Sequence, residues 1–160
     1  MKWARQRQKG FTIVELLVVV VVIAVLASIT VVAYNGLQKR SRDSVRVQDI
    51  SNIKKSLLLY QSYNGGVPAT TTFGGNGPGG WNLSSSGTWL SFLSPILPKI
   101  PVDPVNSGIT DPSAGGLAYY YYCYNTGSGP MPATPNVSLG YHSEVSNQNI
   151  AIGIPVERCL

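Results

Sequence analysis

Residues 9–33 of this chain read KGFTIVELLVVVVVIAVLASITVVA, and this stretch decides the fold. Between Leu16 and Ala33 only Ser28 and Thr30 are not apolar. At ~1.5 Å of rise per residue, a helix over this run is roughly 27 Å long, close to the ~30 Å hydrocarbon core of a bilayer. The apolar residues just before Leu16 supply the rest, so the stretch predicts one membrane-spanning helix near the N-terminus.

One carboxylate, that of Glu15, lies at the edge of the predicted span. An acidic side chain costs ~2.5–3.5 kcal/mol on insertion scales at the centre of a span and less near an interface, so such a residue usually has a partner. No other residue of the span carries a charge that could neutralise it. We therefore expect the partner of Glu15 to come from outside its own helix.

The run Lys9-Gly10-Phe11-Thr12-Ile13-Val14-Glu15-Leu16 resembles the cleavage and methylation motif of type IV prepilins and of the pseudopilins of type II secretion. The resemblance is close over residues 9–35 and looser beyond them. It implies that a prepilin peptidase cuts between Gly10 and Phe11 and that the new Phe11 amine is N-methylated. It also implies that Glu15 pairs with the Phe11 amine of a neighbouring subunit as the helices bundle into a filament.

The same resemblance implies an α+β, pilin-like fold, in which a long N-terminal α-helix packs on a small antiparallel β-sheet head. The expected organisation is a leader peptide over residues 1–10, a transmembrane and assembly segment over 11–35, and a periplasmic or extracellular head over 36–160. The head includes the second half of the helix, to about residue 62. An ordinary secretory signal, cleaved after Ala27, is the alternative. That interpretation gives no role to the acidic side chain of Glu15.

The second half of the predicted helix is amphipathic. Apolar residues recur at steps of three and four and form one stripe: Val47, Ile50, Ile53, Leu57 and Tyr60. The charged residues around them are expected to point away from the core: Arg42, Asp43, Arg46, Asp49, Lys54 and Lys55. Asn35-Gly36 interrupts the helix as a weak point of ~1 kcal/mol where it could bend.

Three strands are expected in the head, over residues 118–124, 139–145 and 147–154, paired antiparallel. Alternation in the first strand places two sets of side chains on opposite faces: Tyr119, Tyr121 and Cys123, and then Tyr120, Tyr122 and Tyr124. A short helix is expected over 88–97 and a glycine-rich linker over 64–87. Three aromatic residues near this linker either pin it to the core or form an exposed contact surface: Phe73, Trp81 and Trp89.

The chain has two cysteines, Cys123 and Cys159. An even pair in a small membrane-tethered domain predicts a disulfide in an oxidising space outside the cytoplasm, and two reduced buried thiols are the alternative. Basic residues flank the span on both sides, so their count leaves its direction nearly tied. With the disulfide, the expected topology is single-pass in the cytoplasmic membrane, N-terminus inside and C-terminus outside, followed by an extracellular or periplasmic filament.

The segment Pro98–Asn106 resembles the proline-rich turn of major pseudopilins and of many short bacterial pilins. In pseudopilins, acidic residues beyond that turn bind calcium. Asp103, Asn106 and Asp111 could offer oxygen atoms to such a hard cation, and the alternative is that they are turn residues flanking prolines. No other metal and no cofactor is expected.

Charge and motifs exclude several classes of function. Four of the twelve Lys and Arg residues lie in residues 1–10, which leaves eight against seven Asp and Glu, so the net charge of +5 does not predict a nucleic-acid partner. No nucleophile elbow, phosphate loop or metal-spaced cluster is present, and we expect no enzyme activity.

The expected function is that of a structural subunit of a type IV pilus-like filament. Its expected partners are copies of itself and other pilins, the prepilin peptidase and methyltransferase, the inner-membrane assembly platform, and the membrane before assembly. A type II secretion pseudopilin is the first alternative. An adhesive minor pilin, with Trp81, Trp89 and the tyrosines as its binding face, is the second.

Overall fold

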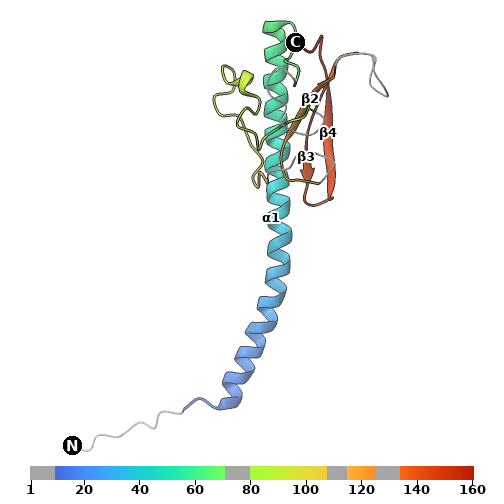
Figure 1. Cartoon of the computed structure of the whole chain (residues 1–160). Helices are drawn as coiled ribbons and strands as arrows, with labels where there is room; N and C mark the ends of the chain where they lie inside the picture. The colour runs from blue at the N-terminus through green and yellow to red at the C-terminus, as the bar shows by residue number, and fades with distance from the viewer. Residues whose placement is uncertain (1–9, 71–79, 108–114, 125–133) are drawn as a thin grey trace, which may run out of the picture. The chain divides into compact units, whose positions relative to one another are not determined.

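The computed structural model describes residues 10–70, 80–107, 115–124 and 134–160. The chain divides into two compact units, Met1–Gln38 and Lys39–Leu160. One helix, α1, runs from Ile13 to Asn64 and contributes to both units. The sheet lies in the second unit together with the C-terminal part of α1, which confirms the predicted α+β, pilin-like fold (Figure 1).

Helix α1 begins and ends two residues later than the predicted Phe11–Ser62 helix. It continues through Asn35-Gly36, where an interruption was expected. A Cβ atom added at Gly36 would meet no atom within 4 Å, so no tertiary contact demands glycine there. The cost of this glycine is therefore the ordinary loss of helix propensity, which the helix tolerates without breaking.

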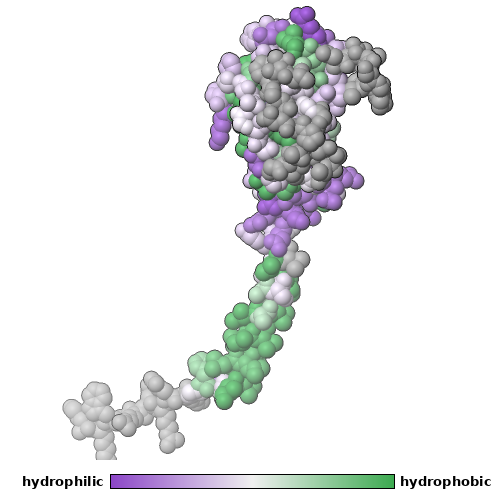
Figure 2. Space-filling view, viewed as in Figure 1, coloured by the Kyte–Doolittle hydropathy of each residue, from purple (hydrophilic) through white to green (hydrophobic). Residues whose placement is uncertain are grey.

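In the first unit, the apolar side chains of α1 are exposed all around the helix axis. Their exposed fractions run from 51% at Val22 to 84% at Ile13. The helix is long and apolar enough to cross a membrane, judged by its length and composition. Figure 2 shows hydrophobic residues covering the visible side of this part of the helix, which agrees with the predicted span. A helix that is apolar on all sides has to be covered by lipid or by other helices.

In the second unit, α1 packs on a four-stranded antiparallel sheet with the order β1-β2-β3-β4. The strands are β1 (Asn82–Leu83), β2 (Tyr120–Tyr124), β3 (Asn136–Ser143) and β4 (Gln148–Pro155). The three longer strands were predicted and β1 was not, because it lies in the segment expected to be a linker. The short helix predicted over 88–97 is a 3-10 turn, η2 (Ser91–Leu93), preceded by Leu90 in a left-handed conformation with φ 40°.

The core of the head lies between α1 and the inner face of the sheet. The helix contributes Ile50, Ile53 and Leu57, and the strands contribute Tyr121, Cys123, Val137, Leu139 and Ile154. The alternation predicted for β2 is confirmed, because Tyr121 and Cys123 belong to this core while the rings of Tyr120, Tyr122 and Tyr124 all contact Trp81.

One part of the predicted helix stripe is wrong. Val47 is 56% exposed, whereas Arg46, expected to point away from the core, is fully buried. Both residues lie at a helical spacing from Ile50, Ile53 and Leu57, so periodicity alone does not distinguish them. Arg46 rather than Val47 is buried because polar groups of the folded head face the side chain of residue 46.

Candidate functional site: the assembly segment and the polar network of the head

The first turn of α1 is closed by a capping box between Thr12 and Glu15. The backbone N–H of Thr12 donates to Glu15 Oε2 at 2.8 Å, and the Thr12 hydroxyl donates to the same oxygen at 2.9 Å. In return, the backbone N–H of Glu15 donates to Thr12 Oγ1 at 3.2 Å. A Thr-x-x-Glu sequence at a helix start is typical of this arrangement, so the local partner of Glu15 was readable from the sequence and was missed.

These partners of Glu15 are neutral donors and supply no counter-charge. Among the described residues, no ion pair involves Glu15. The capping box thus satisfies hydrogen-bonding capacity and favours the negative charge at a helix N-terminus, but leaves the charge itself uncompensated. A counter-charge from outside the helix stays a prediction.

The predicted cleavage point lies directly before this turn. Gly10 and Phe11 are exposed, and the side chain of Phe11 is 85% exposed. A Cβ atom added at Gly10 would meet no atom within 4 Å. The bond between Gly10 and Phe11 therefore lies exposed and outside the helix, and its cleavage stays a prediction. The rest of the predicted leader lies outside the described residues.

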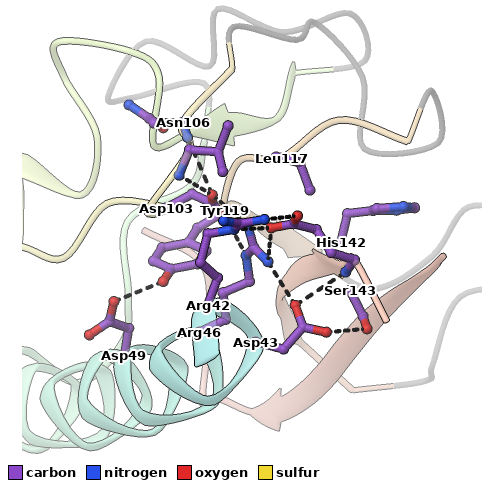
Figure 3. Close-up of polar contacts among 12 residues, drawn as sticks. Arg42, Asp43, Arg46, Asp49, Asp103, Asn106, Leu117, Tyr119, His142 and Ser143 are labelled. Carbon is purple, nitrogen blue, oxygen red and sulfur yellow. Dashed lines mark hydrogen bonds and ion pairs between the residues drawn. The ribbon is translucent and has the colours of Figure 1, made fainter. Parts of the chain in front are cut away.

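In the head, the fully buried guanidinium of Arg46 joins three carboxylates (Figure 3). It donates two hydrogen bonds to Asp103, from Nε to Oδ2 at 2.6 Å and from Nη2 to Oδ1 at 2.9 Å. Its Nη1 lies 2.7 Å from Asp43 Oδ1 and 2.8 Å from Glu144 Oε1. Arg42 adds a second, two-pronged contact to Glu144, with its Nε 2.7 Å from Oε1. We call these five residues the Arg46 network.

The Arg46 network connects three segments that are far apart in the sequence. Asp43 lies on α1 and accepts hydrogen bonds from the Ser143 hydroxyl and from the backbone N–H groups of Glu144 and Val145, which fixes the turn between β3 and β4. Asp103 accepts hydrogen bonds from the N–H groups of Val105 and Asn106, which fixes the proline-rich turn. The network therefore holds both turns against the helix.

The electrostatic state of the network follows from these contacts. The Arg42 guanidinium, with help from Arg46, lowers the pKa of Glu144 to about 2 against the cost of partial burial. Burial alone would raise the pKa of Asp43, but hydrogen bonds from Ser143 and Arg46 outweigh it and lower that pKa. Burial opposes the charge on Arg46, yet its three carboxylate partners raise its pKa. Asp43, Glu144 and Arg46 are therefore charged at neutral pH.

The structure brings together two of the three predicted calcium-binding residues, Asp103 and Asn106. Both oxygens of Asp103 accept hydrogen bonds from Arg46, and Asn106 Oδ1 accepts one from the Ser84 hydroxyl at 2.7 Å. Asp111 lies outside the described residues. The described parts of the chain hold no group of three His, Cys, Asp or Glu side chains that could bind a metal ion. Calcium binding at this turn stays a prediction.

A disulfide joins Cys123 on β2 to Cys159 near the C-terminus. Residues 158–160 also pair with the segment that follows α1. Val67 N–H donates to the Arg158 carbonyl at 3.1 Å, Leu160 N–H donates to the Val67 carbonyl at 2.7 Å, and Ala69 N–H donates to the Leu160 carbonyl at 2.7 Å. The disulfide and these hydrogen bonds fix the C-terminal residues to the core.

The aromatic residues considered for an adhesive face do not form one surface. Trp89 is buried, and its indole N–H donates to the Pro101 carbonyl at 2.8 Å, so it pins the loop to the core. Trp81 instead packs against tyrosines of the opposite face of β2, with its ring centroid 5.1 Å from that of Tyr122. Phe73 lies outside the described residues.

Comparison with known proteins gives a match to a family model and matches to several relatives. The family model for the prokaryotic N-terminal methylation motif matches residues 5–31. A type II secretion system core protein G of Pseudomonas aeruginosa is 29% identical over 109 residues, which cover 62% of this chain and 70% of that protein. The protein of the same name in Escherichia coli is 36% identical over 67 residues, or 42% of this chain and 46% of that protein.

A third relative is matched over a similar length. In Pectobacterium carotovorum, a further type II secretion system core protein G is 36% identical over 64 residues, which span 40% of this chain and 41% of that protein. The matches to the Pectobacterium and Escherichia proteins thus span less than half of those relatives. No solved structure matches the chain significantly.

Proposed function

Because this chain carries the N-terminal methylation motif of the pilin and pseudopilin family, we propose that it is a structural subunit of a type II secretion pseudopilus. The sequence alone favoured a type IV pilus, with the pseudopilus as the alternative. The named relatives favour the alternative, since those reported above are type II secretion system proteins by name. The observation that carries the proposal is this motif on a helix that is apolar enough to span a membrane and whose apolar part, residues 13–33, holds a single carboxylate, that of Glu15.

The proposed pathway has three stages. The precursor resides in the cytoplasmic membrane through α1, with its N-terminus inside and its disulfide-bonded head outside. A prepilin peptidase removes residues 1–10 and the Phe11 amine is methylated. An inner-membrane platform then moves subunits into a periplasmic filament in which the apolar helices pack against one another.

In this proposal Glu15 selects the register of each incoming subunit. Within one subunit, the Glu15 carboxylate accepts hydrogen bonds from Thr12 but has no cation paired with its charge. The Phe11 amine of a neighbouring subunit is the cation that the motif supplies at a matching depth. In an apolar bundle the two charges meet in only one relative position of the two helices. If one helix were shifted by a turn along the other, both ions would be buried without a partner, which is unfavourable.

Replacing Glu15 tests the proposal. We expect Glu15→Leu to be inserted and cleaved between Gly10 and Phe11, as read by mass spectrometry of the N-terminus, yet to form no filaments in a host that assembles the wild type. Glu157→Leu is the matched control, because Glu157 is an exposed carboxylate of the head, and it should assemble normally. Normal filaments from Glu15→Leu would contradict the role of this carboxylate, and a mature N-terminus at Ser28 would contradict the proposed processing.

A further inference from the structure

The surface of the head is more basic than the composition indicates. In the described part of residues 39–160, most acidic side chains are buried or half-buried and have partners: Asp43, Asp103 and Glu144 belong to the Arg46 network, and Asp49 accepts a hydrogen bond from the Tyr119 hydroxyl at 2.8 Å. Among these residues Glu157 is the one exposed acid. Six basic residues are exposed: Lys39, Arg40, Lys54, Lys55, Lys99 and Arg158.

Two of these cations, Lys39 and Arg40, follow the apolar part of α1 closely. They lie six and seven residues after Ala33, so along a helix they are roughly 9–10 Å beyond the end of the apolar run. If the apolar run fills the hydrocarbon core, Lys39 and Arg40 lie at the depth of the lipid headgroups.

In the described part of the head, no carboxylate forms an ion pair with either of these two cations. The nearest carboxylate in the sequence, that of Asp43, is occupied by Arg46 and Ser143, and among the described residues no ion pair involves Lys39 or Arg40. Their neighbours Arg42 and Arg46 differ, because both are committed to carboxylates of the head. Lys39 and Arg40 are therefore available to an external anion.

We propose that Lys39 and Arg40 bind the anionic headgroups of phospholipids while the subunit resides in the membrane. This inference rests on the proposed function for the membrane stage alone. A basic residue near a charged bilayer surface gains enough energy for roughly a fivefold preference for anionic over zwitterionic lipid. The contact would have to break when the subunit leaves the membrane, so it would set part of the barrier to extraction.

Lys54 and Lys55 provide an internal comparison. They lie on the same helix and are exposed in the same way, but they follow Lys39 by at least fifteen residues, or roughly 22 Å. That separation is more than twice the ~8–10 Å Debye length at physiological ionic strength. Their charge therefore contributes little to lipid binding, although it equals the charge of Lys39 and Arg40.

The test uses the full precursor reconstituted into vesicles of mixed phosphatidylcholine and phosphatidylglycerol that also contain a small fraction of a lipid with a photoreactive headgroup. Two probes are compared, a phosphatidylglycerol and a phosphatidylcholine, and cross-linked sites are mapped by mass spectrometry of peptides. In the wild type, we expect the phosphatidylglycerol probe to react preferentially at residues 36–41. Lys39→Gln/Arg40→Gln should lower that preference by roughly 10- to 30-fold, and each single change by roughly fivefold.

Two controls make the outcome specific. Cross-links to the basic residues of the leader report lipid binding on the other side of the membrane and should not change between variants. Lys54→Gln/Lys55→Gln should retain the wild-type preference at residues 36–41. An unchanged preference in Lys39→Gln/Arg40→Gln, or equal reaction of both probes in the wild type, overturns the inference. A precursor that does not float with vesicles of any composition contradicts the proposed function instead.

Discussion

Replacing Arg46 by methionine should destabilise the head more than any single surface change. Methionine roughly fills the volume of the arginine stem but leaves Asp103, whose side chain is fully buried, without a counter-charge. Removing one partner of a buried ion pair typically costs ~3–5 kcal/mol. Asp103 keeps its hydrogen bonds from Val105 and Asn106, and Glu144 keeps Arg42, so we expect about 3 kcal/mol rather than the upper value. This is a large fraction of the ~5–15 kcal/mol that stabilises a typical domain.

The assay is urea unfolding of the detergent-solubilised chain, followed by tryptophan fluorescence, to which the buried Trp89 of the head contributes. Arg46→Met should shift the unfolding midpoint strongly, and Arg46→Met/Asp103→Asn should recover about half of the loss because the unpaired charge is removed. Lys54→Met is the control, since Lys54 is an exposed cation of the same helix. The reasoning would be refuted by an Arg46→Met midpoint equal to that of the control, or by a double variant no more stable than Arg46→Met.

Three other changes have expected outcomes set by the structure. The folded-state pKa of Glu144 is lowered from 4.5 to about 2, so ionised Glu144 contributes about 3 kcal/mol at most to the free energy of unfolding. This contribution is present above pH 4.5 and is lost as the pH falls to 2. The melting temperature measured against pH should show this loss, and Glu144→Gln should flatten that dependence. Reducing the Cys123–Cys159 disulfide, which spans 36 residues, should cost about 4 kcal/mol on the chain-entropy model, read as a lower melting temperature with dithiothreitol; an unchanged melt would count against it. Gly140→Ala should destabilise the head by ~1–3 kcal/mol, because the added methyl group would overlap the Ile150 carbonyl and the Tyr120 ring, whereas Gly36→Ala meets nothing and should increase the helicity measured by circular dichroism.

The elements of regular period were predictable from the sequence. The apolar run and the amphipathic stripe that follows it predicted the two ends of α1 to within two residues each, because both patterns repeat with the period of a helix. The alternation in β2 predicted which side chains face the core, since the period of a strand is two. The strand β1 was missed because two residues within a glycine-rich segment carry no periodicity.

The polar part of the head could not be predicted in the same way. The burial of Arg46 depends on carboxylates at positions 103 and 144, which no local pattern connects to residue 46. Hydropathy places an arginine outside and a valine inside, and here the tertiary contacts reverse that order for Arg46 and Val47. The capping of Glu15 is different, because Thr12 lies three residues away and the local motif was sufficient to find it.

The hydrogen bonds that tie residues 158–160 to Val67 and Ala69 have a consequence for biosynthesis. A ribosome makes the chain from the N-terminus, so the helix emerges and can enter the bilayer well before Cys159 exists. In the proposed topology, the globular part cannot close its last contacts until residues 158–160 have crossed the membrane. The proposal therefore orders maturation by synthesis itself, with membrane insertion first and formation of the last contacts of the folded domain afterwards.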